Sequence, residues 1–207
     1  MKKTIWICSF LALSGFAPSL LRADVIYSVT VDTTPLAATV GYMAFDLTGG
    51  FPLQDNVATI SGFLSTSTLG TSSTSGDVSG TLTPGPLTLT ADQFFNEWLQ
   101  GVTFGSGLTS FTLDLTTNLA AGATPDSFAF YVLDSTFTPF DTSDPSGADS
   151  LFAIDLAGQA TAPQVYTSDF ATVTVNPVVS GAVPEPGSIW LTVAAAVAAG
   201  LCRLRKK

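Results

Sequence analysis

Basic residues are almost absent from the part of the sequence that would form a folded domain. The seven Lys and Arg lie near the two ends, at positions 2, 3, 22, 203, 205, 206 and 207, whereas the segment from Asp24 to Ala182 holds fourteen Asp, one Glu and no base. A domain this acidic repels nucleic acid, anionic lipid and acidic polysaccharide. We therefore expect no nucleic-acid partner, and an acidic polymer would need a bridging divalent cation.

The sequence also lacks most of the side chains used in catalysis. It has no histidine, and its two cysteines, Cys8 and Cys202, lie in apolar segments at the ends. These absences exclude a Ser-His-Asp triad, a Ser-Lys dyad and thiol catalysis in the central segment, together with imidazole or thiolate metal sites. Only a two-carboxylate mechanism remains, and nothing in the sequence pairs Glu97 with a particular Asp. We predict that the protein is not an enzyme and has no catalytic or cofactor-binding residues.

The first 23 residues predict a secretory signal peptide. Lys2 and Lys3 precede an apolar run from Ile5 to Phe16, which is shorter than a spanning helix. The small residue Ala23 places the predicted signal peptidase cut before Asp24, uncertain by a few residues. The central segment is therefore expected to be exported.

The C-terminal end combines three signals in a fixed order. Pro184-Glu185-Pro186 is followed by an apolar stretch from Gly187 to Cys202 and then by Arg203, Arg205, Lys206 and Lys207. As a helix, residues 187–202 would span about 24 Å at 1.5 Å per residue, a little less than a hydrocarbon core. The basic residues are expected to stay on the cytoplasmic side, so that the domain before them lies outside.

This tail resembles the PEP-CTERM sorting signal of bacterial surface proteins, in which a Pro-Glu-Pro tripeptide precedes a short spanning helix and a basic end. The resemblance covers only about the last 25 residues. It implies processing near the tripeptide by an exosortase, a membrane-embedded cysteine protease, in a bacterium with two membranes that makes exopolysaccharide. The expected route is an inner-membrane precursor, held by its C-terminal helix, and then the cell surface or extracellular matrix.

The central segment predicts an all-β domain. Apolar and polar residues alternate in Tyr27–Asp32, Phe111–Thr116 and Ala171–Val175, as in strands with one buried face. Phe128–Leu133 is apolar on both sides, which favours a central strand covered on both faces. Further strands are predicted at 42–47, 57–64, 76–83, 87–90, 102–104 and 151–156. We expect a β-sandwich or jelly roll.

One short helix is predicted within this domain. Thr90-Ala91-Asp92-Gln93 has the spacing of a capping box, and Phe94, Phe95, Trp98 and Leu99 follow at helical spacing before Gly101. We interpret this helix as a lid packed on a sheet.

One stretch of the domain is poor in large apolar residues. Ser65–Ser79 is almost entirely Ser, Thr and Gly and is interpreted as a flexible loop, with a polar outer strand and an O-glycosylated patch as alternatives. The predicted organisation is a signal peptide at 1–23, a domain at 24–175, a spacer at 176–183 and the sorting signal at 184–207, with its helix at about 187–202 and basic tail at 203–207.

The acidic stretch from Asp141 to Asp149 is the one candidate for a cation site. Asp141, Asp144 and Asp149 surround a Gly-containing turn and could supply oxygen ligands to calcium, although the spacing is not that of an EF-hand. These residue types also make ordinary turns, which is the interpretation we favour, with no metal and no cofactor.

From the sequence we expect an exported, noncatalytic protein with a structural role at the cell surface or in the matrix. The first alternative is a carbohydrate-binding module of the exopolysaccharide matrix, with Tyr131, Phe137 or Phe140 stacking on sugar rings. A carboxylate-only hydrolase is the second. The ligand, the strand order and the oligomeric state do not follow from the sequence.

Overall fold

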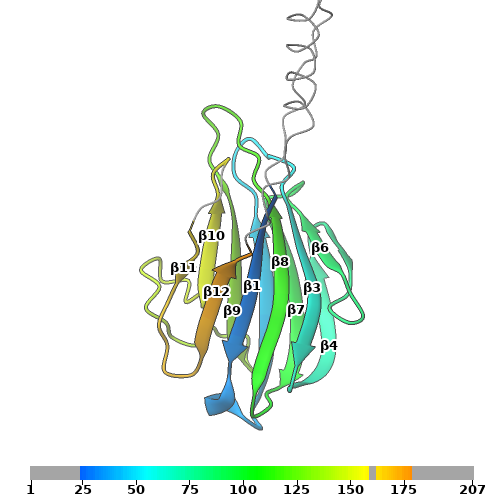
Figure 1. The fold of residues 1–207 in the computed structure, drawn as a ribbon, viewed down its shortest axis with the longest axis vertical. Coiled ribbons are helices and arrows are strands. Elements are labelled where there is room, and N and C mark those ends of the chain that lie inside the picture. The colour runs from blue at the N-terminus through cyan, green and yellow to red at the C-terminus, as the bar shows by residue number, and fades with distance from the viewer. Residues whose placement is uncertain (1–23, 159–161, 179–207) are drawn as a thin grey trace, which may run out of the picture.

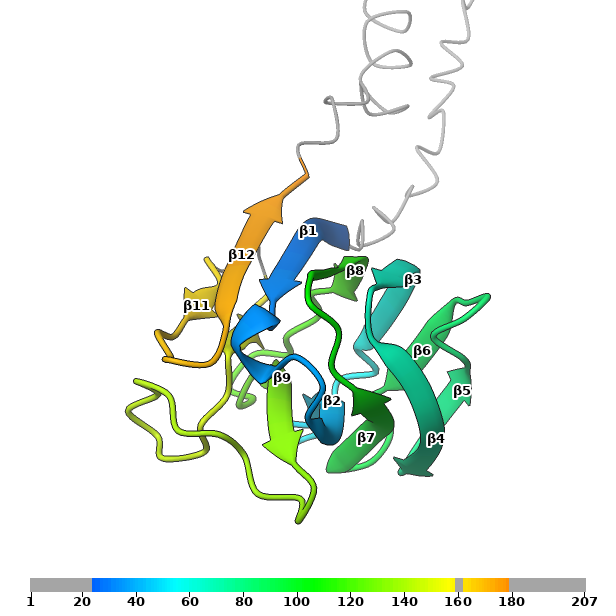
Figure 2. The ribbon, with the colours of Figure 1, turned by 90° about the horizontal axis from the view of Figure 1, so that it is seen from below.

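The computed structural model describes residues 24–158 and 162–178, which form two antiparallel β-sheets packed face to face (Figures 1 and 2). Sheet A has the strand order β12 (Thr172–Pro177), β1 (Asp24–Asp32), β8 (Leu108–Thr116), β3 (Val57–Ser65), β6 (Leu87–Thr90) and β5 (Val78–Gly80). Sheet B has the order β11 (Gln164–Val165), β10 (Phe152–Leu156), β9 (Asp126–Asp134), β2 (Val40–Thr48), β7 (Phe95–Thr103) and β4 (Thr68–Ser75). The prediction of an all-β domain is confirmed.

The inner faces of the two sheets share one apolar core. Period-two alternation buries Tyr27, Val29 and Val31 of β1, as predicted. The rings of Phe45 and Phe111 meet between the sheets with centroids 5.4 Å apart. The ring centroids of Phe111 and Phe130 are 5.7 Å apart. These ring contacts lie between the sheets, so the outer face of each sheet takes no part in them.

The strand β9 departs from the sequence interpretation on its outer face. Phe128, Phe130 and Val132 are fully buried, but Ala129, Tyr131 and Leu133 are only half-buried. The second apolar face of this strand is therefore covered in part, and the covering segment is the loop between β9 and β10.

The Ser/Thr-rich stretch is not a loop. Residues 68–75 form β4, which pairs with β7 at the edge of sheet B, and Val78–Gly80 form β5 at the edge of sheet A. The prediction of a flexible loop is wrong and the alternative of a polar outer strand is right. An edge strand exposed on most sides needs no apolar residues, since its backbone pairing holds it in place.

The helix predicted at Thr90–Leu99 is wrong as well. Ala91–Phe94 is a turn and the following residues belong to β7, whose inward-facing residues are Asn96, Trp98, Gln100 and Val102. Two of these are buried amides that make hydrogen bonds: Asn96 Nδ2 donates to the Leu47 carbonyl and Gln100 Nε2 to the Gly70 carbonyl. Polar residues on the core side hide the period of two, so the aromatic spacing looked helical. Among the described residues the only helix is a 3₁₀ turn, η1 (Thr34–Leu36).

Both limits of the described domain lie at one end of the sandwich, which we call the terminal end. Asp24 pairs with Thr116 at the end of β8, and the Val178 N–H donates to the Ile26 carbonyl. Among the described residues no helix is long and apolar enough to cross a membrane. The predicted signal peptide, the predicted spanning segment and most of the predicted spacer lie outside them.

Candidate functional site

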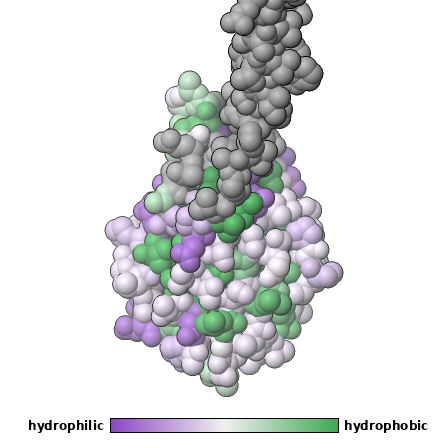
Figure 3. Space-filling model, viewed as in Figure 1, coloured by the Kyte–Doolittle hydropathy of each residue, from purple (hydrophilic) through white to green (hydrophobic). Residues whose placement is uncertain are grey.

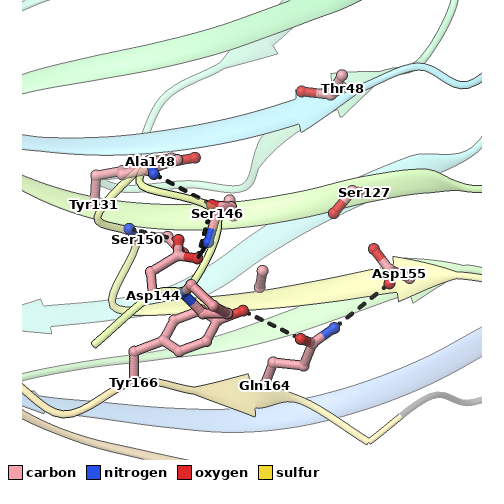
Figure 4. A pocket seen from close by; sticks show the side chains of 13 residues that line it. Thr48, Ser127, Tyr131, Asp144, Ser146, Ala148, Ser150, Asp155, Gln164 and Tyr166 are labelled. Carbon is pink, nitrogen blue, oxygen red and sulfur yellow. Dashed lines mark hydrogen bonds between the residues drawn. The ribbon is translucent and has the colours of Figure 1, made fainter. Parts of the chain in front are cut away.

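A shallow pocket of about 320 Å³ lies on the outer face of sheet B (Figure 4). Its floor is the outer side of β9 and β10, where alternate residues are small or polar, and the loop between these strands forms one wall. It is lined by Thr48, Ser127, Ala129, Tyr131, Asp144, Pro145, Ser146, Ala148, Ser150, Ala153, Asp155, Gln164 and Tyr166. Small floor residues flanked by tyrosines, an amide and hydroxyls make a polar hollow with aromatic sides.

Asp144 holds the wall of the pocket in place. Its Oδ1 accepts hydrogen bonds from the backbone N–H and hydroxyl of Ser146, at 2.9 and 2.7 Å. Its Oδ2 accepts the backbone N–H and hydroxyl of Ser150, at 3.1 and 2.8 Å. Burial alone would raise the pKa of Asp144, but these hydrogen bonds outweigh it and hold the pKa below its usual value.

A line of polar groups crosses the opposite side of the pocket. The Tyr166 hydroxyl donates to Gln164 Oε1 at 3.1 Å, and Gln164 Nε2 lies 3.5 Å from Asp155 Oδ2 (Figure 4). The chain that carries Gln164 and Tyr166 is placed there by β11, which pairs with β10. This side therefore offers one amide, one carboxylate and one phenol within a short distance.

Two carboxylates face each other next to the pocket on the same face. Asp46 of β2 and Glu97 of β7 are directly opposite in the antiparallel register, and both point away from the core. Burial and the charge of Glu97 raise the pKa of Asp46 to about 8, and burial raises the pKa of Glu97. Asp46 Oδ1 is buried without a hydrogen-bond partner among the described residues.

The same surroundings act on Tyr131. Burial, followed by the charges of Asp46 and Asp144 and by Tyr166, raises the pKa of Tyr131 to about 12. Its phenol is thus a neutral hydrogen-bond donor and acceptor at any physiological pH. Tyr131 lines the pocket and lies near enough to Asp46 for that charge to act on its phenol, although neither Asp46 nor Glu97 lines the pocket.

The three aromatic residues that the sequence suggests for sugar stacking lie in different surroundings. Tyr131 lines the pocket. Phe137 is 56% exposed and stacks on Tyr42, with centroids 4.4 Å apart, at the end opposite the terminal end. Phe140 is half-buried and packs against the core, with its ring centroid 4.9 Å from that of Phe170.

The candidate calcium residues are used within their own loop. Asp144 accepts the four hydrogen bonds described above, and Asp149 Oδ1 accepts the Thr142 N–H at 3.0 Å. Within 24–158 and 162–178 there is no group of three or more carboxylates that could hold a metal ion. The carboxylates of Asp144 and Asp149 thus accept hydrogen bonds from their own turn.

Most of the predicted sorting residues lie outside the described part of the chain. These are Ala23, Pro184, Glu185, Pro186, Arg203, Arg205, Lys206 and Lys207. Asp24, on the far side of the predicted cut, is the first residue of β1.

Comparison with known proteins returns no similar protein. No family profile, no curated protein and no solved structure matches this chain.

Proposed function

We propose that the protein is exported, sorted through its C-terminal signal by an exosortase, and displayed at the cell surface, where its β-sandwich is a noncatalytic module that binds a neutral saccharide. The pocket on sheet B carries the binding part of this proposal. Sugars are recognised by aromatic side chains that lie against C–H faces and by fixed amides, carboxylates and hydroxyls. Tyr131, Tyr166, Gln164 and Asp155 supply these groups on one surface.

The negative charge of the domain restricts the class of ligand that the pocket can bind. Asp144 and Asp155 line the pocket, and the segment from Asp24 to Ala182 contains no Lys or Arg to pair with an acidic sugar. An anionic ligand would meet only repulsion. A neutral glycan of the surrounding matrix is the ligand that this site fits, in agreement with the matrix role expected from the sequence.

A glycan array of neutral and acidic sugars, probed with the full chain in detergent, tests the binding. Tyr131→Ala and Tyr166→Ala should each weaken binding to a neutral glycan by about tenfold or more, which corresponds to a loss of roughly 1.4 kcal/mol. Thr112→Ala, on the outer face of sheet A, is the matched control and should bind as wild type. Binding to acidic glycans alone, or to none, would reject the proposed ligand and leave the structural role.

The sorting part of the proposal has its own test. Replacing Pro184, Glu185 and Pro186 by alanine should leave a full-length form in the inner membrane, because the tripeptide is where processing is expected. A variant that reaches the surface with the mass of wild type would show that these residues are not a sorting signal.

A second candidate function is a carboxylate-only glycosidase, favoured by the register that pairs Asp46 with Glu97. Directly opposite residues on adjacent strands have Cβ atoms about 4.5–5.5 Å apart, a spacing close to the carboxyl separation of about 5–5.5 Å that a retaining mechanism needs. A generic glycosidase screen with wild type and Glu97→Gln decides it, since activity that Glu97→Gln abolishes would make the protein an enzyme.

A further inference from the structure

The terminal end of the sandwich exposes large apolar side chains on two loops. Phe51 is 82% exposed and Leu53 44% exposed in the loop between β2 and β3. Phe94 is 72% exposed in the turn between β6 and β7. Side chains of this size so far out of the core mark an interaction surface when they are grouped.

Hydrogen bonds hold these loops next to each other. The Gly49 N–H donates to the Phe94 carbonyl at 2.8 Å. The Phe51 N–H donates to Thr124 Oγ1, and the Thr124 N–H donates back to the Phe51 carbonyl at 3.0 Å. Phe51 and Phe94 are thus presented by fixed backbone.

Two buried polar side chains connect these loops to the core through hydrogen bonds. The side chains of Asn56 and Asp126 are fully buried, and Asn56 Nδ2 donates to Asp126 Oδ2 at 2.8 Å. Asp126 Oδ1 accepts the Gly50 N–H, and Asn56 Oδ1 accepts the Asn118 N–H. The loop that carries Phe51 and the loop between β8 and β9 are therefore one rigid unit.

The chain leaves the domain at this same end. The last described residue, Val178, pairs with Ile26 beside the start of β1 (Figure 1). Only residues 179–186 separate it from the apolar stretch 187–202. Eight residues can span at most about 28 Å, so a membrane-inserted stretch would keep Phe51 and Phe94 close to the lipid surface.

We infer that the terminal end of the sandwich docks on the bilayer, with Phe51, Leu53 and Phe94 inserted at the lipid interface while the precursor is anchored. This inference rests on the proposed anchor at 187–202. Docking would fix the domain upright, with the sheet B pocket opening to the side of the sandwich and Thr48, Ser127 and Asp155 at its membrane-facing edge.

Charge determines which lipid surface is suitable. Asp92 lies two residues from Phe94 and is exposed, and the negative charges of Asp77 and Asp55 act on its carboxyl group. These carboxylates oppose approach to anionic headgroups. The surface that fits both the aromatic residues and the charges is zwitterionic.

Spin labels on the full chain in phosphatidylcholine vesicles test the docking. In a background of Cys8→Ser and Cys202→Ser, a nitroxide is attached to Phe51→Cys, Phe94→Cys or the control Phe137→Cys at the opposite end. Labels at 51 and 94 should be more accessible to oxygen than to a nickel chelate, as expected about 5–10 Å into the interface. The label at 137 should show the reverse.

A fourth label, on Ala195→Cys, separates the two ways of failing. If 195 lies in lipid while 51 and 94 are as water-accessible as 137, the anchor stands and docking is rejected. If 195 lies in water, the anchor and the docking are both rejected.

The variant Phe51→Ser/Phe94→Ser should move a label on Leu53→Cys towards water, and an unchanged label would overturn the role of the two aromatic residues. Stronger insertion on addition of anionic lipid would overturn the assignment to a zwitterionic surface, and a protein partner is indicated if 51 and 94 leave water only when exosortase is added.

Discussion

The outer faces of the two sheets differ although both follow the same alternation of buried and exposed residues. On sheet A several facing pairs are hydroxyl pairs, among them Thr30 with Thr174, Ser28 with Thr112 and Thr59 with Thr88. Figure 3 shows much of this face in pale colours of intermediate hydropathy, with separate hydrophobic and hydrophilic patches. On sheet B the outer residues include Tyr131, Asp46 and Glu97.

The difference comes from what lies over each face. The loop between β9 and β10 folds back over sheet B, where Asp144 fastens it, and it turns a flat surface into a pocket. A half-exposed strand can thus acquire a pocket from the loop that directly follows it in the chain. Four pairs of substitutions test the features that distinguish sheet B.

The largest expected effect is that of Asp46→Asn on the pH dependence of stability. The pKa of Asp46 is about 8 in the fold and near 3.8 in the unfolded chain, so the folded state holds a proton that the unfolded state releases. Wild type should lose stability as pH rises from about 4 to about 8, by up to about 5 kcal/mol. Asp46→Asn cannot ionise and should flatten the curve.

The control for this test is Asp114→Asn on sheet A. Burial and the charge of Asp24 raise the pKa of Asp114 too, but this side chain is more exposed. Urea midpoints between pH 4 and 9 should shift less for Asp114→Asn than for Asp46→Asn. Parallel curves for wild type and Asp46→Asn would show that Asp46 is not protonated in the fold.

The next effect is the loss of the pocket wall in Asp144→Ala. The Ser150 N–H and hydroxyl, in a residue 2% exposed, would lose their acceptor. We expect a loss of about 2–3 kcal/mol in the free energy of unfolding at neutral pH, together with loss of glycan binding. In wild type this stabilisation should disappear as pH falls through the lowered pKa of Asp144.

Asp134→Ala is the matched variant, because Asp134 accepts similar hydrogen bonds from Thr136 and Thr138 in an exposed turn. It should destabilise the domain less, and it should leave binding intact. Equal losses of unfolding free energy in the two variants, measured by urea unfolding, would mean that the hydrogen bonds of Asp144 stabilise the domain no more than those of Asp134.

A smaller effect is expected at the far end of sheet B, where Phe137 has a positive φ of 66°. Phe137→Ala should cost about 1 kcal/mol, because it removes the stack on Tyr42. Phe137→Gly removes the same stack but relieves the left-handed backbone, worth about 1 kcal/mol. The glycine variant should therefore unfold at higher urea than the alanine variant, and the opposite order would exclude backbone strain at this position.

The sequence predicts the sandwich better than the site. Alternation reveals a strand when its inner residues are apolar, as with Tyr27, Val29 and Val31, and it fails in β7, where Asn96 and Gln100 face inward and are satisfied by backbone carbonyls. Pairing alone defines β4, since its exposed Ser and Thr residues carry no pattern.

The pocket was only partly within reach of the sequence. The sequence alone makes Tyr131 a candidate aromatic, but Gln164, Tyr166 and Asp155 join it only through the pairing of β9, β10 and β11. The sequence gives Glu97 no partner, because its register with Asp46 depends on β7, a segment whose pattern predicts a helix. Long-range register is set by the whole core, so no local pattern could supply these neighbours.

The smallest expected effect is that of removing a hydroxyl from sheet A. Thr112 lies between Ser28 and Ser61 in the middle of the outer face, and Thr112→Val keeps the shape and β preference of the residue. The free energy of unfolding should change by less than about 0.5 kcal/mol, and glycan binding should not change. Thr48→Val, the same substitution on sheet B, removes a hydroxyl that lines the pocket and should weaken glycan binding at similar stability. Titration of both variants against one neutral glycan is the measurement. If Thr112→Val weakens binding and Thr48→Val does not, the ligand binds to the hydroxyl face of sheet A, and the pocket on sheet B is not the site.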